Sequence, residues 1–190
     1  PRENIEFNAE FPSFVYHGAL DKGRGLTRIL GLKEELENAG VRGKFTIVGD
    51  GDLADFFRRV SEDDPDIIFL GRLESSELPM VVANSDYGIL PLPDALEWRV
   101  GSPLKVMEFA ASGLKCLTTD VKGTSPFSGE SWILRADKHS PIEEWRDLIL
   151  SDLSEPERVS KERSEARKFS EERMTWGSAL RDLLSFIMGD

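Results

Sequence analysis

Short apolar runs alternate with amphipathic stretches over most of the chain, from residue 13 to residue 136. Runs rich in β-branched and aromatic residues, each bounded by polar residues or glycine, predict strands at 13–18, 44–49, 67–70, 87–90, 114–118 and 132–134. Between the first four, apolar positions at helical spacing predict helices at 26–36, 53–60 and 78–83. Continuous apolar strands separated by helices are typical of a parallel sheet covered on both faces. We therefore expect an α/β, Rossmann-like three-layer domain with a mostly parallel sheet.

The pattern becomes entirely helical from residue 141, and it breaks near 154–156 and again near 175–177. Pro156 marks the start of a new helix, because proline is tolerated in a first helical turn. The densely charged stretch 158–173 indicates a solvated helix face. Residues 178–188 place four aliphatic side chains on one face and predict a packing helix. We interpret residues 1–190 as one domain whose residues 141–190 form a helical tail.

The amino-acid composition limits the kinds of molecule that the protein is expected to bind. Hydrophobic residues make up 39% of the chain and charged residues 31%, and no apolar run is long enough for a membrane span or a signal peptide. The formal net charge of −11 opposes general attraction to nucleic acid or anionic lipid, so any anion must be held by a local cluster of donors. The single cysteine, Cys116, excludes an intrachain disulfide and is expected to be a buried core thiol.

Residues 101–113 carry the clearest chemical signal. Ser102 can cap a helix that Pro103 opens, and the free N–H groups of its first turn would lie beside the Lys105 ammonium. Glu108 follows one turn later along the same helix. If the first turn holds the phosphates of a nucleotide, the Glu108 carboxylate lies where the ribose hydroxyls would be. A nucleoside diphosphate would satisfy both groups.

The same residues fit a second interpretation, which the spacing alone leaves equally open. An ordinary amphipathic helix would turn Leu104, Met107 and Ala111 toward the core. Lys105 and Glu108 would then be solvated side chains without a ligand.

Other polar and glycine positions fall where the predicted strands end. Ligands of open parallel sheets collect at the carboxyl ends of the strands, so Gly18, Gly49, Gly71 and the loop 91–102 are expected to converge there. Gly18 and Gly49 would either form simple tight turns or let the backbone approach a ligand. Arg24, at the start of the next helix, offers planar donors suited to phosphate.

Residues 103–113 resemble the P-x-K-x-x-E-x-x-A-x-G segment of retaining glycosyltransferases of the GT-B type, family 4, the "glycosyl transferases group 1". Further segments resemble the same family in the same order along the chain, and the recognisable motifs cover residues 13 to 125. These segments are 16–26, 45–51, 67–71, 77–79 and 85–91.

The resemblance implies that this chain is the C-terminal, donor-binding half of such an enzyme. The N-terminal acceptor-binding domain has no counterpart here, so we expect the isolated chain to be inactive. The implied reaction is hexosyl transfer from a nucleotide-diphosphate sugar to an unknown acceptor with retention at the anomeric carbon. The implied location is the cytoplasm, or the inner membrane surface through the missing domain.

The resemblance also implies roles for individual residues. Arg24 and Lys105 would be catalytic, because they neutralise the departing diphosphate, and Glu108 would hold ribose hydroxyls. Backbone N–H groups at Ser102 and Leu104 would contact sugar and phosphate, and the donor site would include Gly18, Gly49 and Gly71. No covalent nucleophile, metal or cofactor is required.

Two positions depart from the family pattern. Ala19 stands where many members have an arginine, and Val100 stands where an upstream glutamate often holds sugar hydroxyls. Asp94 and Glu97 are interpreted as solvated loop carboxylates rather than substitutes for that glutamate.

No metal site is apparent from the sequence. His17 and His139 are far apart and have no ligand-like spacing to other residues, and the acidic stretch 62–66 is interpreted as a solvated turn. His17, beside Gly18, would be either a packed side chain or a ligand contact.

Two other functions remain as alternatives. A nucleotide-sugar 2-epimerase of GT-B fold would keep the diphosphate site, but it would need more acidic and histidine chemistry near the sugar. A non-catalytic doubly wound module, such as a receiver-like domain, would need an acidic pair after the first strand, where residues 16–19 offer none. Nucleotide binding separates the enzymes from the signalling module.

Overall fold

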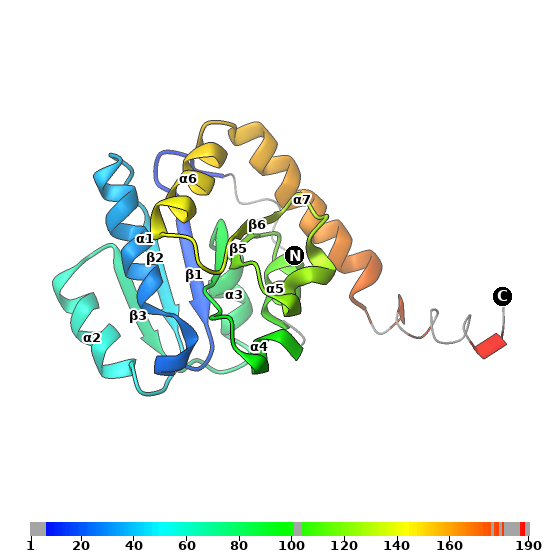
Figure 1. The fold of residues 1–190 in the computed structure, drawn as a ribbon, viewed down its shortest axis with the longest axis horizontal. Coiled ribbons are helices and arrows are strands. Elements are labelled where there is room, and N and C mark those ends of the chain that lie inside the picture. Colours follow the sequence, from blue (N-terminus) through cyan, green and yellow to red (C-terminus); the bar gives the residue numbers. More distant parts are fainter. Residues whose placement is uncertain (1–6, 101–103, 176, 179, 181–186, 189–190) are drawn as a thin grey trace.

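A single parallel sheet of six strands organises the protein (Figure 1). The computed structural model describes residues 7–100, 104–175, 177–178, 180 and 187–188. The strand order is β3-β2-β1-β4-β5-β6, and every pair of neighbours is parallel. The expected fold class is therefore confirmed, and each strand lies within two residues of its predicted bounds: β1 Ser13–His17, β2 Lys44–Val48, β3 Ile67–Gly71, β4 Tyr87–Leu90, β5 Lys115–Thr119 and β6 Ile133–Ala136.

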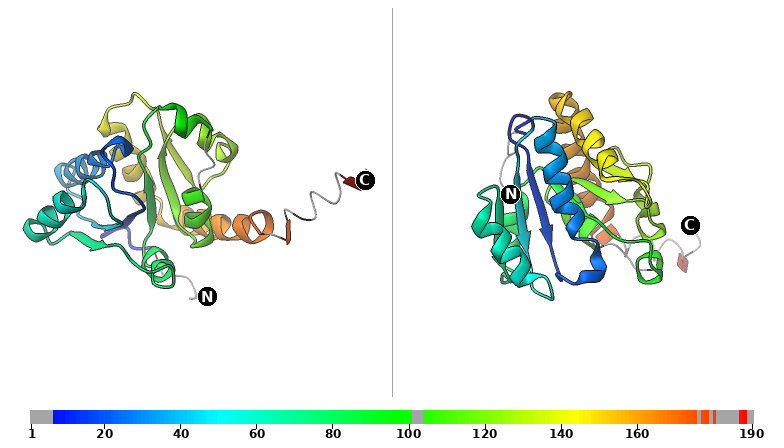
Figure 2. Two further views of the ribbon diagram at one scale, coloured as in Figure 1. Left: turned by 90° about the horizontal axis from the view of Figure 1, so that it is seen from below. Right: turned by 60° about the vertical axis from the view of Figure 1, so that its left-hand side comes forward.

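Helices cover both faces of the sheet (Figure 2). One core cluster joins the sheet to α1 (Thr27–Asn38), α2 (Ala54–Asp63) and α6 (Ile142–Leu153). A second cluster joins the opposite face to α3 (Leu78–Ala83), α5 (Leu104–Ala111) and α7 (Pro156–Arg173). Shorter helical turns lie in three connections: η1 Lys22–Arg24, α4 Leu96–Val100 and η2 Lys122–Phe127.

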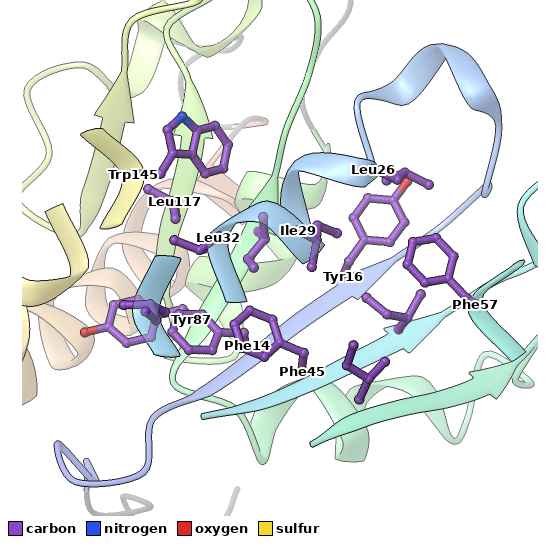
Figure 3. Close-up of a cluster of buried hydrophobic side chains, with 14 of the residues drawn as sticks. Phe14, Tyr16, Leu26, Ile29, Leu32, Phe45, Phe57, Tyr87, Leu117 and Trp145 are labelled. Carbon is purple, nitrogen blue, oxygen red and sulfur yellow. The ribbon is translucent and has the colours of Figure 1, made fainter. Parts of the chain in front are cut away.

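Alternation along β1 assigns its side chains to the two cores. Phe14 and Tyr16 point toward the α1 side, where the Phe14 ring stacks on Phe45 at 4.5 Å and on Tyr87 at 5.1 Å between ring centres (Figure 3). Val15 belongs to the cluster on the other face. This period of two is the signature of a strand buried on both sides.

Close packing of α5 on β4 depends on Gly88. A Cβ atom at this position would lie 2.3 Å from the Phe109 ring, so the ring rests directly on the strand backbone. Cys116 of β5 is fully buried in the same core, which confirms the expected core thiol. Burial raises the pKa of this thiol far above its usual range.

The charged helix α7 has a solvated face, as predicted, but the prediction was wrong for two charged residues on its other face. Glu162 and Arg163 are buried, and Arg163 Nη1 lies 2.7 Å from Asp86 Oδ1 at the start of β4. Lys115 of β5, with no exposed surface, pairs with Glu162 and with Asp152 of α6. Charges on one helix can only be recognised as buried when their partners on other elements are known.

Two other parts of the sequence interpretation need comment. Helix α4 was not predicted, since five residues are too few to show a period. The expected packing helix at 178–188 falls mostly outside the described residues. Among the helices that are described, none combines the length and the hydropathy that crossing a bilayer requires.

Candidate nucleotide site at the carboxyl ends of the strands

Three glycines meet where β1, β2 and β3 end. The Gly18 N–H donates to the carbonyl oxygen of Val48 at 2.9 Å, and the Gly49 N–H donates to that of Gly71 at 2.8 Å. The turns after the three strands are thus joined by their own backbones. The three glycines expected at the carboxyl ends of the strands do lie together in the structure.

Gly49 is required by the close approach of two turns. Its φ is +146°, and a Cβ atom there would lie 1.8 Å from the Gly18 carbonyl oxygen. At Gly71, with φ of +64°, a Cβ would meet no heavy atom within 4 Å. A left-handed backbone conformation therefore explains Gly71, whereas contact between turns explains Gly49.

Lys105 of α5 crosses the end of β1 and lies against Gly18. A Cβ on Gly18, whose φ is +132°, would sit 2.6 Å from Lys105 Cε and 2.9 Å from Nζ. Burial lowers the pKa of Lys105, and repulsion from Arg24 lowers it further, while Glu108 opposes both effects. Lys105 therefore lies against the Gly18 turn, with Arg24 near enough to repel its ammonium.

Arg24 is held in place from two sides. Its Nε donates to Asp21 Oδ2 at 3.0 Å, and its guanidinium carbon lies 4.8 Å from the centre of the Trp98 ring in α4. The stacking is a cation–π contact, which restrains the orientation of the guanidinium. The loop 91–102 was expected at this end of the sheet, but its contact through Trp98 with Arg24 was not predicted from the sequence.

Glu108 lies one turn along α5 from Lys105, with its side chain half exposed. Burial raises the pKa of its carboxyl group, and the Lys105 ammonium acts in the opposite direction. Its Oε2 lies 3.3 Å from Nε2 of His17. The structure therefore brings Glu108 together with Lys105 and adds His17, the side chain whose role the sequence left open.

The ordinary amphipathic interpretation of this helix is wrong for Leu104, whereas Met107 is partly buried and packs against the core. Leu104 is 63% exposed, and the side chains of α5 that are fully buried are Val106, Phe109 and Ala110. Lys105 and Glu108 occupy the edge between the core and the open site. Ser102, the expected cap, falls outside the described residues.

Two hollows border these residues. One, of about 330 Å³, is lined by the turns after β1 and β2 together with residues after β3, including His17, Gly18, Gly49 and Arg72. The other, a groove of about 1250 Å³, runs between α3, α5 and α7 and reaches Glu108. His17 and Leu78 line both, so the two spaces meet beside the end of β1.

Several carboxylates interpreted as solvated are paired instead. Asp94 accepts hydrogen bonds from Arg99 and from Lys138, each at 2.7 Å, and these cations hold its pKa well below its usual range. In the acidic turn 62–66, Asp66 is buried and makes a two-pronged contact with Arg42. These pairs restrain loops near the ends of the sheet.

The two positions that depart from the family pattern lie in different parts of the fold, with Ala19 after β1 and Val100 at the end of α4. Ala19 lines the 330 Å³ hollow and contributes no charge there, whereas Arg72, after β3, lines the same hollow. Glu97 is exposed on α4, as interpreted. In the part of the chain that the structure describes, no three His, Cys, Asp or Glu side chains gather as metal ligands would.

Fold and site together define an α/β domain with paired cations and a carboxylate at the carboxyl edge of its sheet. Residues 12–151 match the sequence model of the family described as glycosyl transferases group 1. The chain belongs to this family. No curated protein matches it in sequence.

Solved glycosyltransferase structures share the fold. A TarM mutant from S. aureus, in complex with fondaparinux, α-GlcNAc-glycerol and UDP, aligns with a TM-score of 0.76 at 17% identity over 97% of this chain and 37% of that one. HepE of Anabaena, in complex with UDP and glucose, aligns with a TM-score of 0.73 at 13% identity, over 95% of this chain and 49% of HepE. WaaG, a glycosyltransferase involved in lipopolysaccharide biosynthesis, aligns with a TM-score of 0.68 at 13% identity, over 87% of this chain and 44% of WaaG. This chain therefore spans between a third and a half of their lengths.

Proposed function

We propose that this chain is the C-terminal, donor-binding domain of a retaining family 4 glycosyltransferase, which transfers a hexosyl group from a nucleotide-diphosphate sugar. One observation carries the proposal. Lys105 lies against the Gly18 turn, Arg24 of another element is near enough to lower the pKa of Lys105, and Glu108 lies one turn along α5 from Lys105. In a chain of net charge −11, such a pair of cations is a local site for an anion.

The paired cations suit the difficult step of glycosyl transfer. The bond between the anomeric carbon and the diphosphate oxygen breaks, and its electron pair leaves with the diphosphate. The acceptor hydroxyl oxygen bonds to the carbon, and its proton passes to the leaving phosphate oxygen. Arg24 and Lys105 stabilise the charge that grows on the diphosphate, and this favours the transition state over the ground state.

The remaining residues bind rather than react. Glu108 accepts hydrogen bonds from ribose hydroxyls, and Gly18, Gly49 and Gly71 shape the hollow that takes the nucleoside. Backbone N–H groups at Ser102 and Leu104 contact phosphate or sugar, and the exposed Leu104 side chain leaves that helix start accessible. HepE and TarM, the solved relatives of this fold, are in complexes that contain UDP.

The proposal includes partners and conditions that the chain itself does not supply. An N-terminal domain would provide the acceptor surface, and without it we expect no transfer. The reaction would need neither a metal nor a cofactor and would take place in the cytoplasm or at the inner membrane surface.

Calorimetric titration of the 190-residue chain with UDP, GDP, ADP and their nucleosides tests the donor site. We expect one diphosphate to bind, and we expect Lys105→Ala and Arg24→Ala each to weaken it about 10- to 100-fold while leaving the nucleoside nearly unchanged. Glu108→Ala should weaken both ligands, because both carry the ribose. Lys168→Ala, at a side chain 73% exposed on α7, is the matched control and should change neither.

Comparing the losses for the diphosphate and for the nucleoside tests whether Lys105 and Arg24 bind phosphate. Equal losses for diphosphate and nucleoside in the Lys105 and Arg24 variants would show that these residues do not bind phosphate. If a diphosphate binds, product analysis with the full-length protein separates glycosyl transfer from epimerisation.

A further inference from the structure

His17 occupies a position that the sheet would normally give to an apolar side chain. It is the last residue of β1, and Val15, two residues earlier on the same face, is buried in the core formed with α5. His17 is 5% exposed. Its Nε2 is fully buried and makes no hydrogen bond within the described residues. A buried polar atom without a partner costs free energy, so its presence needs an explanation.

The histidine ring is held in one orientation. The ring of Phe109 meets it edge to face, with 5.4 Å between centres and an angle of 86° between planes. In this orientation Nε2 lies 3.3 Å from Oε2 of Glu108. A small rotation of the carboxylate, which is half exposed, would turn this approach into a hydrogen bond.

The imidazole is neutral under physiological conditions. Burial lowers the pKa of His17 to about 4, and the nearby Lys105 ammonium contributes to the shift. A neutral imidazole carries one N–H, and only a proton on Nε2 gives the Glu108 carboxylate a donor from this side.

We infer that His17 is a positioning residue of the donor site: its Nε2–H fixes one oxygen of the Glu108 carboxylate, so that the carboxylate faces the two ribose hydroxyls. The inference rests on the proposed function. A carboxylate uses about four lone-pair sites, so one hydrogen bond from His17 leaves enough for both hydroxyls. Fixing an otherwise mobile side chain before the ligand arrives reduces the entropy lost on binding.

The location of His17 supports this role over a purely structural one. Its ring lines both the 330 Å³ hollow and the groove that reaches Glu108. A ribose that joins a base in the hollow to phosphates near Lys105 would pass beside this ring. The His17 side chain therefore lies beside the expected position of the ribose hydroxyls.

A double-mutant cycle with two ligands tests the inference. The probes are whichever of UDP, GDP and ADP binds the chain, and its 2′,3′-dideoxy analogue. We expect His17→Leu to weaken the ribonucleotide about tenfold and the dideoxy analogue less than about twofold. His17→Gln, which retains a donor at a similar reach, should stay within about threefold of the parent. In a Glu108→Ala background, His17→Leu should have no further effect.

Thermal unfolding shows whether each variant is folded, and His17→Met replaces the leucine variant if that variant is not. Equal losses for both ligands, or additive effects of the His17 and Glu108 changes, would overturn the inference and leave the proposed donor site intact. Failure of the parent chain to bind any of the three diphosphates would overturn both.

Discussion

Single glycines set the geometry of the candidate site. The carbonyl oxygen of Gly18 would lie 1.8 Å from a side chain at Gly49, and Lys105 occupies the space where a side chain at Gly18 would be. The absence of two Cβ atoms thus allows the turn after β2 to close on the turn after β1, and allows the partly buried Lys105 side chain to cross the end of β1. Glycine is needed at these positions because it allows close contact between neighbouring segments, as much as because its backbone is free to adopt a positive φ.

The substitution Gly49→Ala should destabilise the protein strongly. Its Cβ would clash with a backbone oxygen that neighbouring hydrogen bonds hold in place, so we expect a loss of more than about 3 kcal/mol in the free energy of unfolding. Gly40→Ala is the matched control. It also has a positive φ, +82°, but a Cβ there meets nothing within 4 Å, so about 1 kcal/mol is expected. Urea unfolding of both variants gives the comparison, and similar losses would contradict the steric argument.

At the scale of elements, the short helix α4 matters more than its five residues suggest. Asp94, just before it, is paired with Arg99 and Lys138, which ties the loop to the segment after β6. Trp98 is thereby held over the Arg24 guanidinium. A cation of the candidate site is thus oriented by an element that is far away in the sequence.

Replacing this aromatic contact should affect ligand binding more than folding. We expect Trp98→Leu to weaken the diphosphate that binds about 3- to 10-fold, since Arg24 loses its cation–π support, and to leave the nucleoside unchanged. Leu96→Ala, on the same helix but 71% exposed, is the control. Calorimetry on both variants measures the effect; an equal loss with Leu96→Ala would mean that α4 acts only through general packing.

Across the whole molecule, buried charges connect the last described long helix to the sheet. Arg163 of α7 contacts Asp86, and it also donates to the carbonyl oxygen of Gly113, which follows α5. Asp86 in turn accepts hydrogen bonds from the backbone and the hydroxyl of Ser13, at the start of β1. One ion pair therefore ties α7 to β1, β4 and α5 at the end of the sheet opposite the candidate site.

Removal of the guanidinium should be costly. Arg163→Leu leaves the buried Asp86 carboxylate without its cation, and we expect about 3 to 5 kcal/mol lower stability. Lys161→Ala, at a side chain 78% exposed on the same helix, should change stability by less than about 0.5 kcal/mol. Denaturant titration of both variants measures the difference. Comparable stabilities for the two variants would show that the buried pair does not hold α7 in place.

The sequence predicts the sheet well because its strands are uninterrupted apolar runs; β4 at residues 87–90 is predicted to the residue. The sequence also predicts that Lys105 and Glu108 lie close together, because both are on one helix. It does not predict Trp98 over Arg24, or Arg163 with Asp86, because such pairs join side chains far apart in the chain. Partners of this kind become visible only once the strand order is known.

The position of β1 has a consequence for how the chain folds. This strand comes first, yet it lies in the interior of the sheet, and its neighbour β4 begins at Tyr87. On a ribosome, β1 and β2 can pair early, while the other side of β1 stays open until β4 has been made, and Asp86 lacks its cation until α7 has followed. Long-range pairing of this kind slows folding, because chain entropy is lost before the contacts form. A nascent chain that halts between β3 and β4 would therefore expose the apolar edge of β1 to neighbouring chains.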